Sequence, residues 1–358
     1  MTATYSKGDA IGNYIQTLDR IFHKFSFDTK IFSDFTLKNP HSSKYKPTGN
    51  DILWFHYSLY SDNLQYLEKS NDTKIIDFHG VTPSYLFRGY NAELERLCQK
   101  GNDLLKQYSG CVDLCVVHSE YSRSVLENNG YKNIIRLPLV VDMHRLEKIK
   151  QDEKLATSVK KIKYMLFVGR IVPQKSIINI IKVFYHLKQL QTDFKLFFIG
   201  DYNFSKEYMI EIMKVIKQLN LFDDVVFTGK LDDSALITFY KHASLFINLS
   251  EWETFCVPLI EAMYYQIPII GYNKTAVPET IGDAGILFDK IDYLEIAKRI
   301  NELLNDTKKY ELLKLKCEER IQYFTELQLE LKLSPLLKEL SGLNNENCLC
   351  GSAIRGRS

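Results

Sequence analysis

Short apolar runs alternate with longer amphipathic segments along most of the chain. An apolar run of about 4–8 residues is typical of a buried strand, whereas apolar residues that recur every three or four positions are typical of a helix. Strand-like runs in the first half are Thr29–Ser33, Asp51–Phe55, Lys74–Phe78, Asp113–Val117 and Asn133–Leu137. Those in the second half are Tyr164–Val168, Lys195–Ile199, Val225–Thr228, Leu245–Leu249, Ile267–Ile270 and Gly285–Phe288.

Helix-like segments separate these runs. They are Ile11–Phe25, Ala92–Tyr108 and Glu120–Asn129, followed by Ile177–Leu190, Lys206–Leu219, Asp233–Lys241 and Tyr293–Leu304. Strands that are apolar on both faces and alternate with helices predict parallel sheets covered by helices on both sides. The fold class is therefore α/β.

A charged, lysine-rich stretch at Val141–Lys163 lacks a strand and predicts a domain boundary. We predict two Rossmann-like domains, one at 1–141 and one at 142–318. A helix at 319–340 is expected to pack across both domains, and residues 341–358 are expected to be a flexible tail. Ligands bind such sheets at the carboxyl ends of the strands, so two facing domains would hold a ligand between them.

Composition narrows the function classes. The chain has 46 Lys and Arg residues against 44 Asp and Glu residues, a net charge of +2 that does not indicate a nucleic-acid partner. Seven scattered cysteines favour reduced thiols and a cytoplasmic location. The opening residues lack the apolar segment of a signal peptide, and no apolar run approaches the ~20 residues of a membrane-spanning helix.

The stretch Ser250–Glu261 carries the strongest candidate chemistry. It joins the apolar run Leu245–Leu249 to a helix with Pro258 in its first turn. The unpaired N–H groups and the dipole of a helix N-terminus favour a bound phosphate. Glu253 lies in the loop and Glu261 about one turn into the helix. The helix dipole alone also favours acidic residues here, which is the alternative interpretation of Glu261.

Two strand ends in the first half carry further candidates. Gly8, Asp9 and Asn13 open a helix, and glycine lets the backbone approach a ligand closely. Their spacing departs from Gly-x-Gly-x-x-Gly, and a plain turn capped by Asp9 or Asn13 is an alternative. His79 follows the run Lys74–Phe78, where a ligand would lie; a structural hydrogen-bonding role is the alternative.

A strand end in the second half carries two cations, Arg170 and Lys175, before a helix. A guanidinium fork and an ammonium group both suit the oxygens of a diphosphate. The Gly-Lys-Ser/Thr ending of a Walker loop is missing. The alternative is a pair of solvated surface cations.

Together these stretches resemble a glycosyltransferase of family 4, the group 1 class, which is a retaining enzyme of the GT-B fold. The second half carries the specific motifs, which are Gly-Arg-x4-Lys ending at Lys175, Phe-x-Gly at Phe227–Gly229, Glu253-x7-Glu261, and Pro278-Glu279 with Gly282 and Gly285. The first half resembles a bacterial subset with Gly8-Asp9-Ala10-x-x-Asn13 and His79-x-x-Thr82-Pro83.

The resemblance implies roles for the motif residues. Arg170 and Lys175 would neutralise the leaving diphosphate. Glu253 would hold hydroxyls of the donor sugar, and Glu261 would accept hydrogen bonds from the ribose. His79 would lie over the reacting face of the sugar. His79, Glu253, Arg170 and Lys175 are therefore the expected catalytic residues.

Further positions would line the donor and acceptor sites. The backbone of Phe255, Cys256 and Val257 would meet the phosphate and sugar. The backbone of Lys230 and Leu231 would meet the base, and Gly8 would lie close to the diphosphate. Asp9 and Asn13 would face the acceptor side of the cleft.

The chain departs from the family pattern at three positions. Thr254 and Cys256 replace the glycines of Glu-Gly-Phe-Gly, and Ser176 follows Lys175 where glycine is usual. These side chains put the loop geometry and the sugar preference of the family in question.

The predicted reaction is transfer of a sugar from a nucleotide-diphosphate sugar to a glycan or lipid-linked acceptor in surface polysaccharide biosynthesis. The chain has no Asp-x-Asp pair, so cationic side chains are expected to replace a metal, and no cofactor is expected. A nucleotide-sugar epimerase and a non-catalytic donor-binding partner of a transferase complex are the alternatives. A peripheral location at the inner face of the plasma membrane, through residues such as Arg88 and Tyr90, is compatible with a lipid-linked acceptor.

Overall fold

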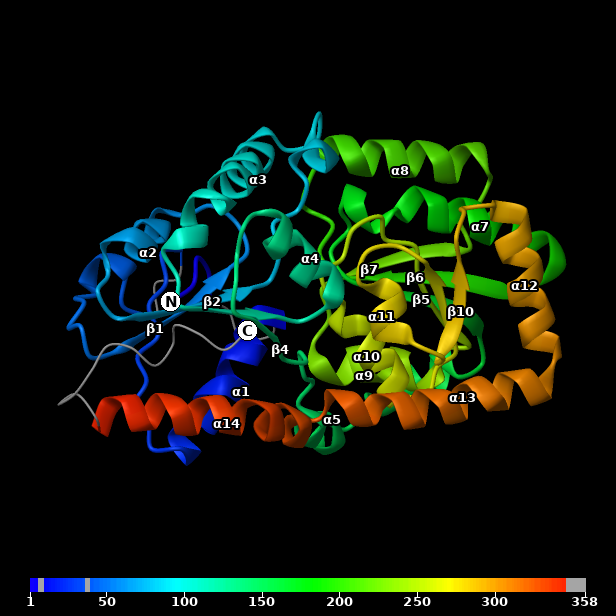
Figure 1. Cartoon of the computed structure of the whole chain (residues 1–358). Helices are drawn as coiled ribbons and strands as arrows, with labels where there is room; N and C mark the ends of the chain where they lie inside the picture. Colours follow the sequence, from blue (N-terminus) through cyan, green and yellow to red (C-terminus); the bar gives the residue numbers. More distant parts are fainter. Residues whose placement is uncertain (6–9, 36–38, 346–358) are drawn as a thin grey trace.

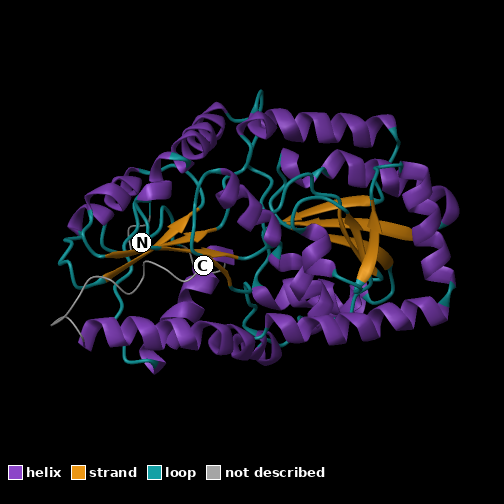
Figure 2. Cartoon of the chain, viewed as in Figure 1, coloured by secondary structure: helices purple, strands orange, loops and turns teal. Residues whose placement is uncertain are grey.

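The computed structural model describes residues 1–5, 10–35 and 39–345, and the side chains up to residue 342. It contains two parallel β-sheets that lie side by side, each covered by helices on both faces (Figures 1 and 2). The predicted α/β class with two parallel sheets is confirmed.

The first sheet has the strand order β1-β2-β3-β4. Its strands are β1 (Ile52–Tyr57), β2 (Thr73–Phe78), β3 (Leu114–Val117) and β4 (Ile134–Arg136), all parallel. The helices of this half are α1 (Ala10–Lys24), α2 (Tyr66–Lys69), α3 (Ala92–Leu105) and α4 (Glu120–Asn128). Short 3-10 helices occur at Ser42–Lys44, Asp62–Gln65, Ser84–Phe87 and Gln107–Gly110.

The strand predicted at Thr29–Ser33 does not form. Ser33 makes only an isolated parallel bridge to Thr2, which in turn bridges to His56 of β1. Apolar residues made this segment resemble a strand, but a strand needs a continuous partner, and among the described residues the segment has only single bridges. The other four strands predicted in this half are confirmed.

The second sheet has the order β10-β9-β8-β5-β6-β7. Its strands are β5 (Lys163–Val168), β6 (Phe194–Ile199), β7 (Val225–Gly229), β8 (Leu245–Asn248), β9 (Ile269–Tyr272) and β10 (Gly285–Phe288). The helices here are α7 (Ile177–Leu190), α8 (Lys206–Gln218), α9 (Asp233–His242), α10 (Val257–Tyr264), α11 (Val277–Ile281) and α12 (Tyr293–Asn305). All six predicted strands of this half are confirmed.

The chain crosses between the two sheets twice. The first crossing follows β4 and leads into two helices, α5 (Met143–Lys148) and α6 (Glu153–Val159), before β5. The second leads from α13 (Thr307–Ile321) through the 3-10 turn Gln322–Phe324 into α14 (Glu326–Asn345). The crossings touch each other where Val141 N–H donates to Phe324 O at 3.4 Å.

The last two helices run along one side of the molecule and span both halves (Figure 1). The helix α13 packs on α10 and β10, whereas α14 packs on α1 of the first half. Buried leucines recur along α14 at helical spacing, at Leu329, Leu333, Leu337 and Leu340. The helix extends to Asn345, into the segment expected to be a tail.

One hydrophobic core cluster joins residues of both halves and of the crossings, including Tyr14, Val141, Phe255 and Leu333. Two further clusters fill the outer faces of the second and first sheets. Within the described residues no helix is long and apolar enough to cross a membrane.

Candidate active site

The carboxyl ends of the first three strands of the first sheet bring polar side chains together. His56 lies in β1 and is paired in register with Asp77 of β2, His79 follows β2 directly, and His118 follows β3. All four residues are buried. Because parallel strands end at the same edge of a sheet, side chains from separate parts of the sequence meet here.

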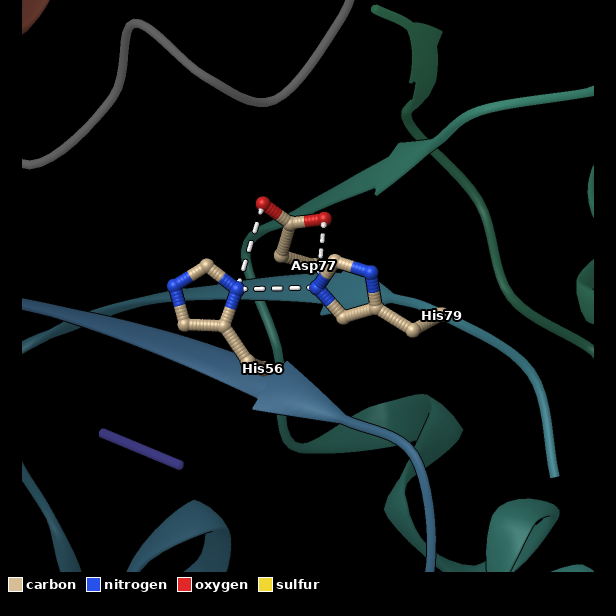
Figure 3. Close-up of side chains that lie close together, drawn as sticks. All are labelled: His56, Asp77 and His79. Atoms are coloured by element: carbon tan, nitrogen blue, oxygen red, sulfur yellow. Dashed lines mark hydrogen bonds and ion pairs between the residues drawn. The ribbon is translucent and has the colours of Figure 1, made fainter. Parts of the chain in front are cut away.

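The four side chains form a tight polar cluster. Figure 3 shows His56 Nδ1 facing His79 Nε2 at 2.9 Å, with each of these nitrogens 3.6 Å from the carboxylate of Asp77. His118 Nε2 lies 2.9 Å from Asp77 Oδ1. Trp54 Nε1–H donates to Asp77 Oδ2 at 2.8 Å.

Burial and charge shift the pKa values of this cluster. Burial works to raise the pKa of Asp77, but the neighbouring histidines outweigh it and hold that pKa below its usual range. Burial lowers the pKa of His79 to about 4, although Asp77 opposes the shift. His79 is therefore neutral at pH 7, and its Nε2 faces Nδ1 of His56.

Lys175 and Glu253 meet in the second half. Lys175 ends the 3-10 turn Pro173–Lys175 after β5, and its Nζ donates to Glu253 Oε1 in the loop before α10. Both side chains are largely buried, at 19% and 9% exposure. Asn248 Nδ2, at the end of β8, lies 3.5 Å from the same Glu253 oxygen and 3.1 Å from Cys256 Sγ. Two of the four predicted catalytic residues thus form one ion pair.

Arg170 is exposed and is not part of the Lys175–Glu253 pair. It lies on the side of the second half that faces the first half. Burial raises the pKa of Cys98 on α3 to about 11, and the charge of Arg170 acts in the opposite direction. The turn Pro173–Lys175 also packs against the turn Ser84–Phe87. The loop that carries both predicted cations therefore borders the first half of the chain.

Glu261 is half-buried, about one turn into α10. Its Oε2 accepts a hydrogen bond from Tyr240 Oη at 2.8 Å. Burial raises the pKa of Glu261, which the Tyr240 hydrogen bond and the charge of Arg145 partly offset. A small cavity of about 20 Å³ beside Glu261 is lined by these residues and by Asp233, Leu236 and Tyr265. Among the described residues, no contact joins Glu261 to the Lys175–Glu253 pair.

The remaining predicted positions are scattered around the same edge. Cys256 and Val257 form the start of α10, and Phe255 packs edge-on against His118 with ring centroids 6.4 Å apart. Lys230 is exposed and Leu231 half-buried in the loop after β7. Asn13 lies in the first turn of α1. Gly8 and Asp9 lie outside the described residues.

The loop before α10 contacts the histidine cluster across the two halves. Thr254 Oγ1 donates to the backbone oxygen of His79 at 2.6 Å, and Ser119 Oγ donates to the backbone oxygen of Thr254 at 2.8 Å. A Cβ atom added to Gly80 would lie 2.1 Å from Thr254 Cγ2. Trp252 Nε1–H also donates to Tyr121 Oη at 3.1 Å. Thr254 therefore fits against the glycine beside His79.

His56, His118 and Asp77 were not predicted from the sequence to be site residues. His56 lies one residue beyond the predicted strand Asp51–Phe55, and His118 one residue beyond Asp113–Val117. The strand-end argument that selected His79 would have found both if it had been applied to every strand.

Comparison with known proteins finds a family match in the second half of the chain. Residues 148–319 match the family model described as glycosyl transferases group 1. This segment is similar to the group 1 glycosyl transferases. The matched segment contains Arg170, Lys175, Glu253 and Glu261.

Two curated bacterial proteins are similar to parts of this chain. N-acetyl-alpha-D-glucosaminyl L-malate synthase of Bacillus anthracis is 28% identical over 273 residues, which cover 72% of this chain and 66% of that protein. O-antigen chain mannosyltransferase B of Escherichia coli is 27% identical over 145 residues, which cover 40% of this chain and 37% of that protein. The chain thus spans less than two thirds of the length of these two relatives.

Solved structures of other glycosyltransferases share the fold. The structure of Anabaena HepE in complex with UDP-glucose superposes with a TM-score of 0.72 at 15% sequence identity, covering 94% of this chain and 98% of HepE. The chain has the GT-B fold, as its motifs predicted.

Proposed function

We propose that this protein is a retaining glycosyltransferase that moves a sugar from a nucleotide-diphosphate sugar to a hydroxyl of a glycan or lipid-linked acceptor in surface polysaccharide biosynthesis. The observation that carries the proposal is the Lys175–Glu253 pair beside the N-terminus of α10, at the carboxyl edge of the second sheet. Similarity to an N-acetyl-alpha-D-glucosaminyl L-malate synthase and to an O-antigen chain mannosyltransferase supports a hexose donor.

Lys175 and Arg170 have the charge that the reaction needs. Glycosyl transfer passes through an oxocarbenium-like state in which negative charge grows on the leaving diphosphate. A fixed cation or a helix N-terminus beside that group stabilises this state more than the ground state. When the donor binds, Lys175 would contact the diphosphate in place of part of its contact with Glu253. Glu253 could then accept hydrogen bonds from sugar hydroxyls.

A divalent ion bridging the diphosphate is not part of the proposed reaction. Lys175 and Arg170 would supply the positive charge that such an ion provides in other transferases. The acceptor hydroxyl would attack the face of the sugar that the diphosphate leaves, with a diphosphate oxygen taking its proton. The anomeric configuration of the donor would then be retained.

The acceptor side would lie in the first half, around Asn13 and the predicted positions Gly8 and Asp9. A lipid-linked acceptor would bring the protein to the inner face of the membrane. Of the two residues expected to face a membrane, Arg88 pairs with Glu95 at 3.1 Å and Tyr90 donates to Glu211 at 2.8 Å.

The test is single-residue removal of the cations. Lys175→Ala and Arg170→Ala are each expected to lower kcat by about 10²-fold, the scale for removing one group that stabilises the leaving charge. Matched controls are Lys298→Ala and Arg299→Ala, which remove exposed cations on α12. Transfer is measured by mass spectrometry of the acceptor, and retention by NMR of the product anomer.

Several results would contradict the proposal. Near-normal transfer in both Lys175→Ala and Arg170→Ala would remove these residues from the reaction. Turnover that appears only when Mg²⁺ or Mn²⁺ is added would overturn the role given to the cations. Release of an altered nucleotide sugar without any acceptor would indicate an epimerase.

A further inference from the structure

The cluster of His56, Asp77, His79 and His118 contains more hydrogen-bond acceptors than protons to satisfy them. His118 Nδ1 lies 3.0 Å from the backbone oxygen of Leu137, and only the ring can supply the proton of this hydrogen bond. In a neutral His118 the other nitrogen, Nε2, is then an acceptor. It lies 2.9 Å from Asp77 Oδ1, which is also an acceptor.

These two atoms have no hydrogen-bond partner. Both His118 Nε2 and Asp77 Oδ1 are buried, and neither makes a hydrogen bond of acceptable geometry. Most buried polar atoms in proteins are satisfied, so a facing pair of unsatisfied acceptors needs a physical cause. A positive charge bound between or beside them would remove the repulsion.

The separations among the ligand atoms suit a metal ion. One potential ligand atom from each of His56, Asp77 and His79 lies within 4.8 Å of the others. His56 Nδ1 and His79 Nε2 lie 2.9 Å apart. His56 Nδ1 lies 3.6 Å from Asp77 Oδ2, and His79 Nε2 lies 3.6 Å from Asp77 Oδ1. A tetrahedral zinc ion with bonds of about 2.0–2.1 Å places its ligand atoms ~3.3 Å apart, within this range.

The surroundings of the cluster are also those of a metal site. A carboxylate ligand is usually hydrogen-bonded in turn, as Asp77 is by Trp54 Nε1–H at 2.8 Å. This hydrogen bond is to Oδ2, and the other oxygen, Oδ1, has no hydrogen-bond partner.

We propose that His56, Asp77 and His79 bind one zinc-class divalent ion. Imidazole and carboxylate ligands together suit zinc, and the burial of all three ligands favours a structural role. The ion would join the ends of β1 and β2 and hold the His79–Gly80 turn against Thr254. This site goes beyond the proposed transferase reaction, in which no ion bridges the diphosphate.

The first experiment measures metal in the full-length protein without a histidine tag. Elemental analysis after incubation with Zn²⁺ and dialysis is expected to find about one zinc per chain. Replacement by Co²⁺ is expected to give the visible absorption of a tetrahedral ion with nitrogen and oxygen ligands. A folded protein that retains no zinc and gives no cobalt spectrum would overturn the proposal and leave an Asp77–imidazolium ion pair as the explanation.

Variants locate the ion. His56→Gln and Asp77→Asn are each expected to lower zinc affinity at least tenfold. The control His144→Gln removes a histidine on α5 whose side chain is 90% exposed, and it should retain the ion. Zinc retained equally by all three variants would place it elsewhere and refute the site.

Two readouts separate this proposal from the transferase proposal. A zinc-edge anomalous signal between His56 and His79 in crystals of the wild-type protein needs no variant to fold. Binding of a nucleoside diphosphate, measured by calorimetry, is expected to depend on Lys175 and Arg170 and not on the ion. A protein that binds zinc but transfers no sugar would contradict only the proposed function, and the reverse result only the metal site.

Discussion

Ser176 has a backbone conformation that glycine adopts more readily. Its φ of 55° and ψ of 40° are left-handed, at the position where the family pattern has glycine. The hydroxyl of Ser176 is buried and makes no hydrogen bond, and as the residue preceding α7 its side chain does not cap the helix. Cys256, the second replaced glycine, also has a positive φ, of 113°. Both positions therefore have a positive φ, which glycine adopts more readily, despite their side chains.

Ser176→Gly is expected to stabilise the protein by ~1 kcal/mol, because it relieves the left-handed strain and removes a buried unsatisfied hydroxyl. Greater freedom of the unfolded chain offsets part of this gain. The matched control is Ser205→Gly, since Ser205 has an extended φ of −153° and caps α8 through Tyr208 N–H. Urea denaturation should show higher stability only for Ser176→Gly, and a loss of stability in that variant would contradict the strain argument.

Glu261→Gln is expected to gain stability relative to the wild type as the pH rises. Burial raises the pKa of Glu261 in the folded state, so the folded state binds more protons than the unfolded state. The wild type therefore loses stability as the pH rises from the unfolded pKa of about 4.3 through the raised pKa. Glutamine imitates the protonated form and does not suffer this loss.

The measurement is urea denaturation at pH 4 and pH 7. The stability difference between Glu261→Gln and the wild type should be larger at pH 7. Glu127→Gln, at an exposed position on α4, is the control and should show no such change. An equal difference at both pH values would contradict the burial effect on Glu261.

At the scale of elements, the loop between β8 and α10 contacts the first half through Thr254 and Trp252. The methyl group of Thr254 packs against Gly80, and its hydroxyl donates to His79 O at 2.6 Å. The loop therefore meets the turn after β2 by shape as well as by hydrogen bonding. A family glycine at position 254 would have neither contact.

Gly80→Ala is expected to destabilise the protein more in the wild type than in a Thr254→Gly background. The new Cβ would lie 2.1 Å from Thr254 Cγ2, a clash that the second substitution removes. The left-handed strain at Gly80, with a φ of 82°, remains in both backgrounds. A double-mutant cycle should give a coupling energy of about 1–3 kcal/mol.

Gly89→Ala supplies the matched control for this cycle. Gly89 has a φ of 80°, but an added Cβ meets no atom within 4 Å. Its cost should therefore be the strain alone, about 1–2 kcal/mol, and independent of residue 254. A coupling energy near zero between Gly80 and Thr254 would show that the two halves do not meet here.

At the scale of the whole molecule, α14 returns the end of the chain to the first half. Leu333→Ala is expected to cost about 2–5 kcal/mol, because this leucine is fully buried in the core shared by both halves. Leu331→Ala is the matched control on the same helix, since Leu331 is 57% exposed. Equal stability of the two variants in urea denaturation would show that α14 does not pack on α1.

Most strands and helices could be predicted from the sequence because the spacing of apolar residues determines them locally. The prediction was correct wherever a run such as Tyr164–Val168 is buried on both faces. It failed at Thr29–Ser33, where strand formation depends on a partner strand. The motif residues Lys175 and Glu253 were also found in sequence, and the structure pairs them. The orientation of His79 toward His56 could not be predicted, because a rotamer and a protonation pattern depend on neighbours from other strands.

The two crossings between the sheets meet at the hydrogen bond from Val141 to Phe324. Within the described residues, both covalent links between the two halves therefore pass through one small region, where Phe324 packs edge-on against Phe255 of the candidate site with ring centroids 5.7 Å apart. A rotation of one half against the other must be absorbed by backbone torsions there. In such a rotation, parts of the two halves far from Val141 move apart more than the residues beside Phe324 do.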